Sequence, residues 1–144
     1  ANHIVWRRYI VPRIFIPDDK FFDDLVAKFE KEYISLDYRD ILTIRQCKDI
    51  TVHEAVKDSS FTGNADAFVD TFLKEVRTHI EGRNIDQVLV CIIPDNDESI
   101  LMETMSHLND FMETFGEETE ARWGFCHSKE GTPMRLIVAV GKNS

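Results

Sequence analysis

Two carboxylates stand three residues apart in the segment Ser35-Leu36-Asp37-Tyr38-Arg39-Asp40-Ile41, with an aromatic residue between them. Two carboxylates on one short loop suit acid–base chemistry, because one can polarise an attacking water while the other holds a cation or the shape of the loop. The same residues could instead cap a helix that begins near Arg39, which is a common use of aspartate. The two interpretations are compatible, and the surrounding elements decide what the segment can reach.

The composition narrows the classes of function. The chain carries 26 acidic against 17 basic residues over 144 positions, which gives a formal net charge of -9. A surface this acidic repels phosphate backbones, so we expect no nucleic-acid partner. Arg7, Arg8 and Arg13 form a basic island that is too small to reverse this expectation. No apolar run approaches the roughly 20 residues that cross a bilayer, so we expect no membrane span.

Cysteine and histidine usage favours a reducing, cytoplasmic setting and no metal site. Cys47, Cys91 and Cys126 are widely spaced and form no CxxC pair. The histidines are scattered, and His127 beside Cys126 is the nearest approach to a ligand pair. Adjacent residues on a strand point to opposite faces, so this pair is unsuited to one ion. The chain begins with Ala1 rather than Met, which we interpret as a piece of a longer polypeptide.

Apolar residues at helical spacing predict three long helices, over residues 17–33, 64–82 and 99–115. Asn64 is a good N-cap for the second helix, and Gly82 fits its C-terminal stop. Thr51-Val52-His53-Glu54 has the form of a capping box, which predicts a short helix from about Val52 to Lys57. Residues 40–48 fit either a helix or a short strand.

Strands are predicted between and after these helices. The continuous apolar run 87–93 is typical of a strand that is covered on both faces. Two later strands, 121–126 and 134–140, are predicted to pair as an antiparallel hairpin through the turn between them. Residues 3–16 have strand character that breaks near Pro12, since proline cannot donate to a ladder.

Together these elements predict an α+β fold in which helices cover a mixed sheet, with strand-helix-strand-strand order after Gln87. A two-layer sandwich is the expected form, and a three-layered sandwich is the alternative. We divide the chain into residues 1–33, a strand segment with an amphipathic helix, and residues 34–144, which form the main domain.

This order of elements, with the acidic segment in front, resembles the carboxy-terminal domain of the FtsZ/tubulin family. The bacterial loop of that family reads Asn-Val-Asp-Phe-Ala-Asp-Val, to which residues 35–41 are similar. Val88-Leu89-Val90-Cys91-Ile92 is similar to the family's Val-Leu-Val-Asn-Ile, and Trp123-Gly124-Phe125 stands where the family often has Phe-Gly-Ala. The last strand, Arg135 to Gly141, resembles Arg-Val-Thr-Val-Ile-Ala-Thr-Gly. The resemblance covers about residues 34–142.

The resemblance implies an assembly domain that supplies filament contacts and an acidic loop for the GTP site of the neighbouring subunit. It implies that Asp37 and Asp40 are catalytic in trans, with Ser35 as a weaker polar contact. The chain alone would bind no cofactor, whereas GTP and Mg²⁺ would belong to the assembled parent, whose partners are its own nucleotide-binding domain and like subunits. The sequence departs from the family at Ser35, where Asn is usual, and at Arg39, where Ala is usual. It also contains no Gly-rich or Walker-type phosphate loop.

Two other classes of function stay open at this point. The first is a stand-alone adaptor or regulatory module without nucleotide chemistry. The second is a small-molecule enzyme that uses Asp37 or Asp40 as a base, which a deep cleft lined by both residues would favour. Trp6, Tyr9 and Phe15 bear on the choice. Exposed, they would mark an interface with a missing domain; paired into the sheet, they would indicate a self-sufficient fold.

Overall fold

The computed structural model describes residues 8–34, 38–95, 102–126 and 131–143. The elements found there are, in chain order, β1 Arg13–Phe15, α1 Asp19–Glu32, β2 Tyr33–Ile34, α2 Tyr38–Arg45, β3 Lys48–Val56, α3 Ala65–Ile80, β4 Gln87–Ile93, α4 Met102–Met112, β5 Glu120–Cys126 and β6 Arg135–Lys142. The three long helices that the sequence predicts are confirmed as α1, α3 and α4. The ambiguous segment 40–48 is mostly helical, because α2 extends to Arg45.

The described strands form one six-stranded sheet in the order β1-β3-β6-β4-β5-β2. β4 runs parallel to β5 and antiparallel to β6, so it lies between them. The predicted hairpin of residues 121–126 and 134–140 is therefore wrong, because β5 and β6 each pair with β4 rather than with each other. Every residue of β4 is buried, so its backbone N–H and C=O groups are shielded from water. Neighbouring strands on both edges supply the hydrogen bonds that these groups need.

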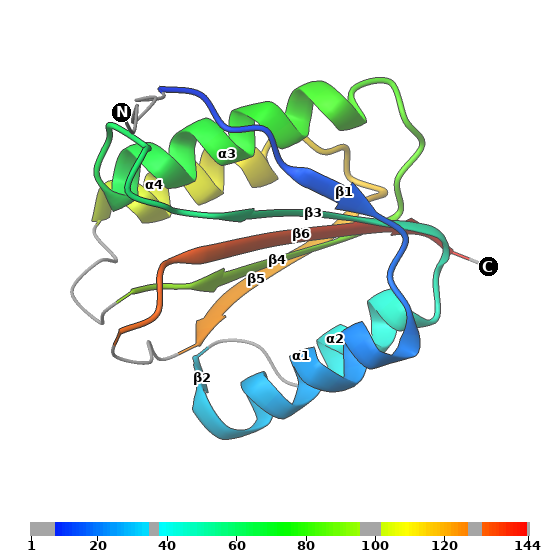
Figure 1. The fold of residues 1–144 in the computed structure, drawn as a ribbon. Coiled ribbons are helices and arrows are strands. Elements are labelled where there is room, and N and C mark those ends of the chain that lie inside the picture. The colour runs from blue at the N-terminus through cyan, green and yellow to red at the C-terminus, as the bar shows by residue number, and fades with distance from the viewer. Residues whose placement is uncertain (1–7, 35–37, 96–101, 127–130, 144) are drawn as a thin grey trace.

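Helices cover both faces of this sheet. Val90 of β4 joins the core cluster that packs under α3 and α4, whereas the next residue, Cys91, joins the cluster that packs with α1 and α2. Figure 1 shows the same arrangement, with α3 and α4 on one side of the sheet and α1 and α2 on the other. The protein therefore has three layers, and the expected two-layer sandwich is corrected to the three-layered alternative. The cause is the continuous apolar run of β4, which leaves both faces in need of cover.

Local capping sets the limits of α3. Asn64 has an extended backbone, and its side-chain oxygen accepts a hydrogen bond from the Ala67 amide at 2.8 Å. The helix ends at Ile80, and Gly82 follows with φ 77°, a left-handed conformation that glycine adopts without strain. The predicted N-cap and the predicted stop are both confirmed.

The short helix predicted over residues 52–57 is wrong, because that stretch lies mostly in β3. β3 pairs with β1 on one side and with β6 on the other, which satisfies its backbone as a strand. Its β-branched residues suit a pleated surface, and Val52 is fully buried in the cluster with α1 and α2. Glu54, which the capping box would place against a helix terminus, instead forms ion pairs with Arg13 and Arg135.

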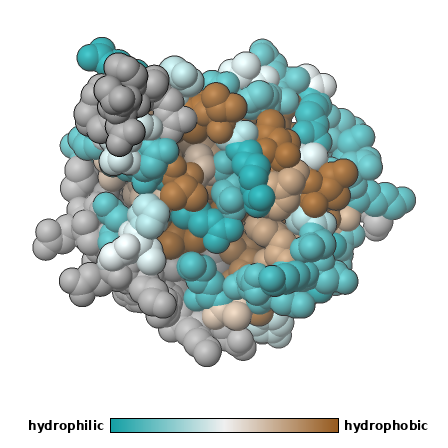
Figure 2. Space-filling view, viewed as in Figure 1, coloured by the Kyte–Doolittle hydropathy of each residue, from teal (hydrophilic) through white to brown (hydrophobic). Residues whose placement is uncertain are grey.

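The first described residues lead into the edge of the sheet. β1 pairs antiparallel with β3, and Phe15 packs against the cluster with α1 and α2. Tyr9, Val11 and Ile16 lie on the surface with exposed fractions of 58%, 74% and 82%. Figure 2 shows apolar side chains between polar ones on this face of the molecule. Trp6 lies outside the described residues. The aromatic residues of this segment are thus divided between surface and sheet.

Candidate functional site

Of the three residues of the predicted acidic site, the structure describes Asp40. Ser35 and Asp37 lie outside the described residues. Asp40 occupies the first turn of α2, directly after the segment 35–37. Its side chain is 22% exposed. The neighbouring Ile41 is fully buried and fixes this turn against the sheet. A carboxylate in a first turn also interacts favourably with the helix dipole, so a capping role and a functional role are compatible here.

The guanidinium of Arg122 forms an ion pair with Asp40. Nε of Arg122, on β5, lies 3.1 Å from Oδ1 of Asp40. Nη1 of the same side chain donates to Oε1 of Gln87 at 3.2 Å, and Nη2 donates to Oε2 of Glu120 at 2.7 Å. The three nitrogens therefore contact three different elements, α2, β4 and β5. A planar guanidinium with all of its nitrogens engaged has little freedom to reorient.

The polar contacts continue from Arg122 to the last strand. Gln87 is buried, and its Nε2 donates to Oδ1 of Asn143 at 3.2 Å. The backbone N–H of Asn143 in turn donates to Oδ2 of Asp86 at 2.8 Å. The backbone N–H of Glu120 donates to the backbone carbonyl of Asp86 at 2.9 Å. This chain of hydrogen bonds fixes the starts of β4 and β5 against the end of β6. The anchor of Asp40 is thus part of the rigid end of the sheet.

The far end of α2 is fixed separately, by ion pairs to α1. Nη2 of Arg45 lies 3.1 Å from Oδ1 of Asp19, and Nη1 lies 2.9 Å from Oδ1 of Asp23. The hydrogen bonds that Arg45 donates to Asp23 and Asp19 raise the pKa of its guanidinium above the ordinary value. The guanidinium also lies over the Phe22 ring, 5.7 Å from its centre. Both ends of α2 are therefore tied down, Asp40 to β5 and Arg45 to α1.

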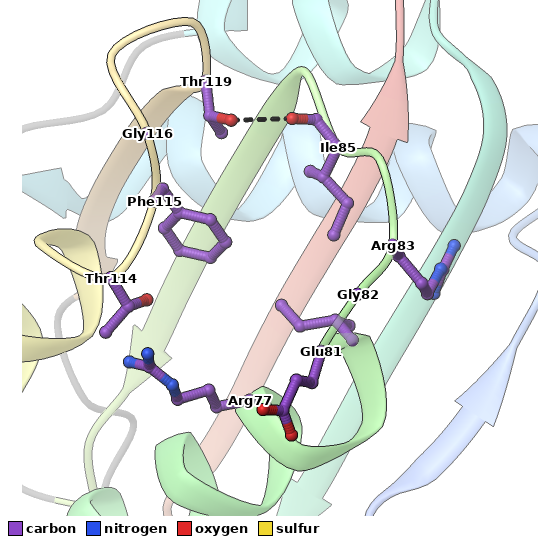
Figure 3. Close-up of a pocket in the computed structure, with 10 residues that line it drawn as sticks. Arg77, Glu81, Gly82, Arg83, Ile85, Thr114, Phe115, Gly116 and Thr119 are labelled. Atoms are coloured by element: carbon purple, nitrogen blue, oxygen red, sulfur yellow. Dashed lines mark hydrogen bonds between the residues drawn. The ribbon is translucent and has the colours of Figure 1, made fainter.

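The described cavities lie away from Asp40. One, of about 230 Å³, opens between the end of α3 and the connection from α4 to β5. Figure 3 shows Arg77 extending toward Thr114 on one side of it, while Arg83 points away toward β3, where it donates to the Thr51 hydroxyl at 3.1 Å. Two others, of about 430 and 300 Å³, lie between α3 and α4 and beside residues 9–13. Asp40 lines none of these three cavities, so they offer it no pocket within its own chain.

Two negative findings hold for the described parts of the chain. No group of three or more His, Cys, Asp or Glu side chains is arranged to hold a metal ion there. In the same parts, no helix combines the length and the apolar character that crossing a bilayer requires.

A buried histidine on the opposite face of the sheet was not anticipated from the sequence. His53 of β3 is 1% exposed, and neither ring nitrogen has a hydrogen-bond partner. Burial, and then the nearby charges of His79 and Arg83, lower the pKa of His53 from 6.5 to about 4. The His79 ring centre is 6.2 Å away. The ring is therefore held neutral in the folded protein at neutral pH.

A second histidine bridges two helices on that face. Nε2 of His107, on α4, lies 3.2 Å from Oδ2 of Asp66, and Nδ1 lies 3.3 Å from Oδ1 of Asp70. Both carboxylates belong to α3, so the contact fixes the two helices relative to each other. Thr104 adds a hydrogen bond to Asp66 at 3.2 Å. The arrangement is explained by helix packing alone.

Neither a scan against models of protein families nor a search of curated proteins finds a match to this chain.

The role of Arg122 has no local signal in the sequence, because its partner Asp40 lies on an element far from it along the chain. The acidic segment itself could be recognised from residue types and spacing, whereas the residue that holds it required the fold.

Proposed function

We propose that this chain is the carboxy-terminal assembly domain of an FtsZ/tubulin-like GTPase. In this proposal it supplies filament contacts and an acidic loop that activates GTP hydrolysis on the neighbouring subunit. Asp37 and Asp40 act in trans, and Ser35 is a weaker polar contact. The GTP, with Mg²⁺ beside it, is held by the nucleotide-binding half of the partner subunit rather than by this chain.

The observation that carries the proposal is the placement of Asp40. It lies in the first turn of α2, it is partly exposed, and a guanidinium holds it at the surface. None of the three cavities described above includes it. A carboxylate that is held at the surface and lines none of these three cavities is suited to a substrate that a second molecule brings to it. This is the division of labour that the resemblance implies.

The arrangement of the strands supports the same conclusion. The segments similar to the family's sequence, 88–92 and 135–141, lie in β4 and β6, which are neighbours in one sheet. The strand-helix-strand-strand order after Gln87 is present as β4, α4, β5 and β6. Had these two segments belonged to separate sheets, the resemblance would have lost its basis.

The chemistry asked of Asp40 is modest. Phosphoryl transfer to water needs the water oriented in line with the bond that breaks, and charge on the phosphate oxygens balanced by cations. A carboxylate at the interface can accept a hydrogen bond from that water and so orient it. Because the chain has a net charge of -9, a cation must accompany any phosphate that approaches it closely. The proposal therefore requires GTP to arrive with its metal ion. We also propose that the assembly forms in the cytoplasm.

The test is a complementation in trans. An FtsZ-type GTPase from the same organism, with both aspartates of its own loop changed to alanine, binds GTP but depends on a loop supplied from outside. Phosphate release is measured as this chain is added. The wild-type chain is expected to raise the rate to a plateau, and Asp40→Asn is expected to lower that plateau by at least about 10-fold, since a positioned acid-base group typically contributes 10²–10⁴-fold.

Asp110→Asn is the matched control, because this exposed carboxylate lies on α4, across the sheet from Asp40. It should leave the plateau unchanged. GTP binding by the partner, followed with a fluorescent analogue, should be the same with all variants. An absence of stimulation by the wild-type chain, or equal stimulation by Asp40→Asn, would overturn the proposal.

One observation favours a second candidate, a stand-alone adaptor module without nucleotide chemistry. β1 covers the edge of β3, and Phe15 packs into the core, so the first segment completes the sheet of its own chain. The exposure of Tyr9 argues against this second candidate, because a residue at an interface with another domain would also be exposed here. An adaptor of this kind would leave GTP turnover unchanged at every concentration, which the complementation assay measures directly.

A further inference from the structure

We infer that Arg122 is a positioning residue for Asp40: it orients the Asp40 carboxylate before a neighbouring subunit docks. This inference rests on the proposed function and adds to it a residue that lies outside the segment 35–41. It assigns to Arg122 no contact with the nucleotide. Its effect on turnover passes through Asp40.

The direction of the guanidinium is set by the sheet rather than by α2. Gln87 and Glu120 face each other in the register of β4 and β5, and both accept hydrogen bonds from Arg122. Gln87 is buried and is itself bonded to Asn143. Nη1 and Nη2 are held by these two strands, so the sheet sets the position of the guanidinium. Its remaining nitrogen, Nε, lies 3.1 Å from Oδ1 of Asp40 in an ion pair.

Burial of neighbouring residues fixes the backbone of Asp40, whereas the ion pair with Arg122 acts on its carboxylate. Ile41 and Ile44 are buried and hold α2 on the sheet. An aspartate side chain in a first turn has several accessible rotamers, and these differ in where they place the carboxylate. A misplacement of about 1 Å in a positioned group can lower a rate by about 100-fold. The ion pair selects one rotamer in advance of docking.

A purely structural role for Arg122 would predict a loss of folding stability when the guanidinium is removed. A positioning role predicts a loss of turnover instead. Arg122 and Asp40 have side chains that are 34% and 22% exposed, and ion pairs of this exposure contribute little to folding stability. Loss of the guanidinium should therefore leave the unfolding midpoint nearly unchanged. Docking of the domain, reported by the chain concentration that gives half of the maximal stimulation, should also be unchanged. The plateau rate should fall.

The experiment is a double-mutant cycle in the complementation assay. The chains compared are wild type, Arg122→Gln, Asp40→Asn and the double variant, with Arg122→Lys as a conservative variant. Arg77→Gln is the matched control, because it removes an exposed arginine from α3, on the opposite face of the sheet. Each chain is also unfolded in urea, so that a variant that fails to fold is recognised.

We expect Arg122→Gln to lower the plateau rate by about 3- to 10-fold with half-saturation within 2-fold of wild type. Arg122→Lys should give an intermediate loss, because one amine cannot reach three acceptors. The double variant should be no slower than Asp40→Asn alone, because a residue that acts through Asp40 has no effect once that carboxylate is gone.

Two results would overturn the inference while leaving the proposed function intact. One is a plateau for Arg122→Gln equal to wild type alongside a clear loss in Asp40→Asn. The other is a double variant whose loss is the product of the two single losses, which would mean that Arg122 acts elsewhere. A different pattern, in which Asp40→Asn has no effect, would overturn the proposed function and this inference with it.

Discussion

The two faces of the sheet are built in different ways. On the face under α3 and α4, the core is a large apolar cluster in which four aromatic residues, Phe61, Phe68, Phe72 and Phe111, are buried. On the face with α1 and α2, the apolar cluster is smaller, and charged side chains of intermediate exposure surround it. The first face is suited to holding the fold together. The second is suited to fixing polar groups in place, and it carries Asp40.

This comparison makes opposite predictions for the two faces. Substitutions under α3 and α4 should affect stability strongly and stimulated turnover little, provided that the protein remains folded. Substitutions around Arg122 and Asp40 should do the reverse. The predictions below run from the largest expected effect on stability to the smallest.

The largest effect is expected for Phe72→Ala. Phe72 is fully buried between α3 and the sheet, and removal of a ring of this size leaves a cavity. Such changes cost about 3–5 kcal/mol. Urea unfolding measures the loss, with Ile16→Ala as the control, because Ile16 is 82% exposed and its change should stay within about 0.5 kcal/mol. A loss below about 1 kcal/mol for Phe72→Ala would contradict the assignment of the main core to this face.

The second effect is a dependence of stability on pH, through His53. The pKa of His53 is about 4 in the folded protein, against an ordinary value of 6.5 for histidine. Below pH 6.5 the unfolded chain therefore binds a proton that the folded chain does not, so stability is complete above that pH and falls as the pH drops toward 4. The difference corresponds to about 3 kcal/mol.

The measurement is the free energy of unfolding from urea titrations at pH 7, 6, 5 and 4. His53→Leu removes the titrating ring and should flatten this part of the profile. His79→Leu is the comparison, because it removes one of the nearby charges that lower the pKa of His53 and should flatten the profile only in part. An unchanged slope in His53→Leu would show that other groups set the acid sensitivity.

The third effect is the loss of the α3 cap. Asn64→Ala removes the oxygen that accepts from the Ala67 amide, and it should cost about 1 kcal/mol. Asn64→Asp keeps an acceptor at the same place and should retain most of the stability. Thermal unfolding compares the two variants. Equal losses in both would mean that the cap contributes little and that packing alone defines the start of α3.

The smallest effect on stability is expected for Arg122→Gln. Because the ion pairs of Arg122 are partly exposed, the variant should lose less than about 1 kcal/mol. Urea unfolding beside Phe72→Ala gives the comparison under one set of conditions. A loss as large as that of the core variant would remove the distinction between the two faces.

Local sequence predicted those parts of the fold that local physics decides. The apolar run of β4, the Asn64 cap and the Gly82 stop each depend on residues within a few positions, and all three are as expected. The capping-box interpretation of Thr51–Glu54 was wrong, because pairing with β1 and β6 overrides a local preference for helix. The hairpin of β5 and β6 was wrong for a related reason. Proximity along the chain favours that pair, whereas β4 satisfies both strands.

The candidate site shows the same difference between what local sequence predicts and what only the packing of distant elements reveals. The acidic segment was singled out by its residue types and its resemblance to a family loop, and its assignment as a site stays a prediction. Arg122 was not singled out, because an ion pair between α2 and β5 depends on the packing of a helix against a sheet. His53 escaped notice because its stretch was expected to be helical, and only the alternation of β3 places it under α3.

The most direct test of the central claim is the plateau rate of GTP turnover that this chain stimulates in a partner whose own loop has been inactivated. Asp40→Asn should reduce that plateau by at least about 10-fold, with no change in half-saturation and with an unfolding midpoint close to that of wild type. Wild-type turnover with Asp40→Asn, in a chain that docks and folds normally, would contradict the account.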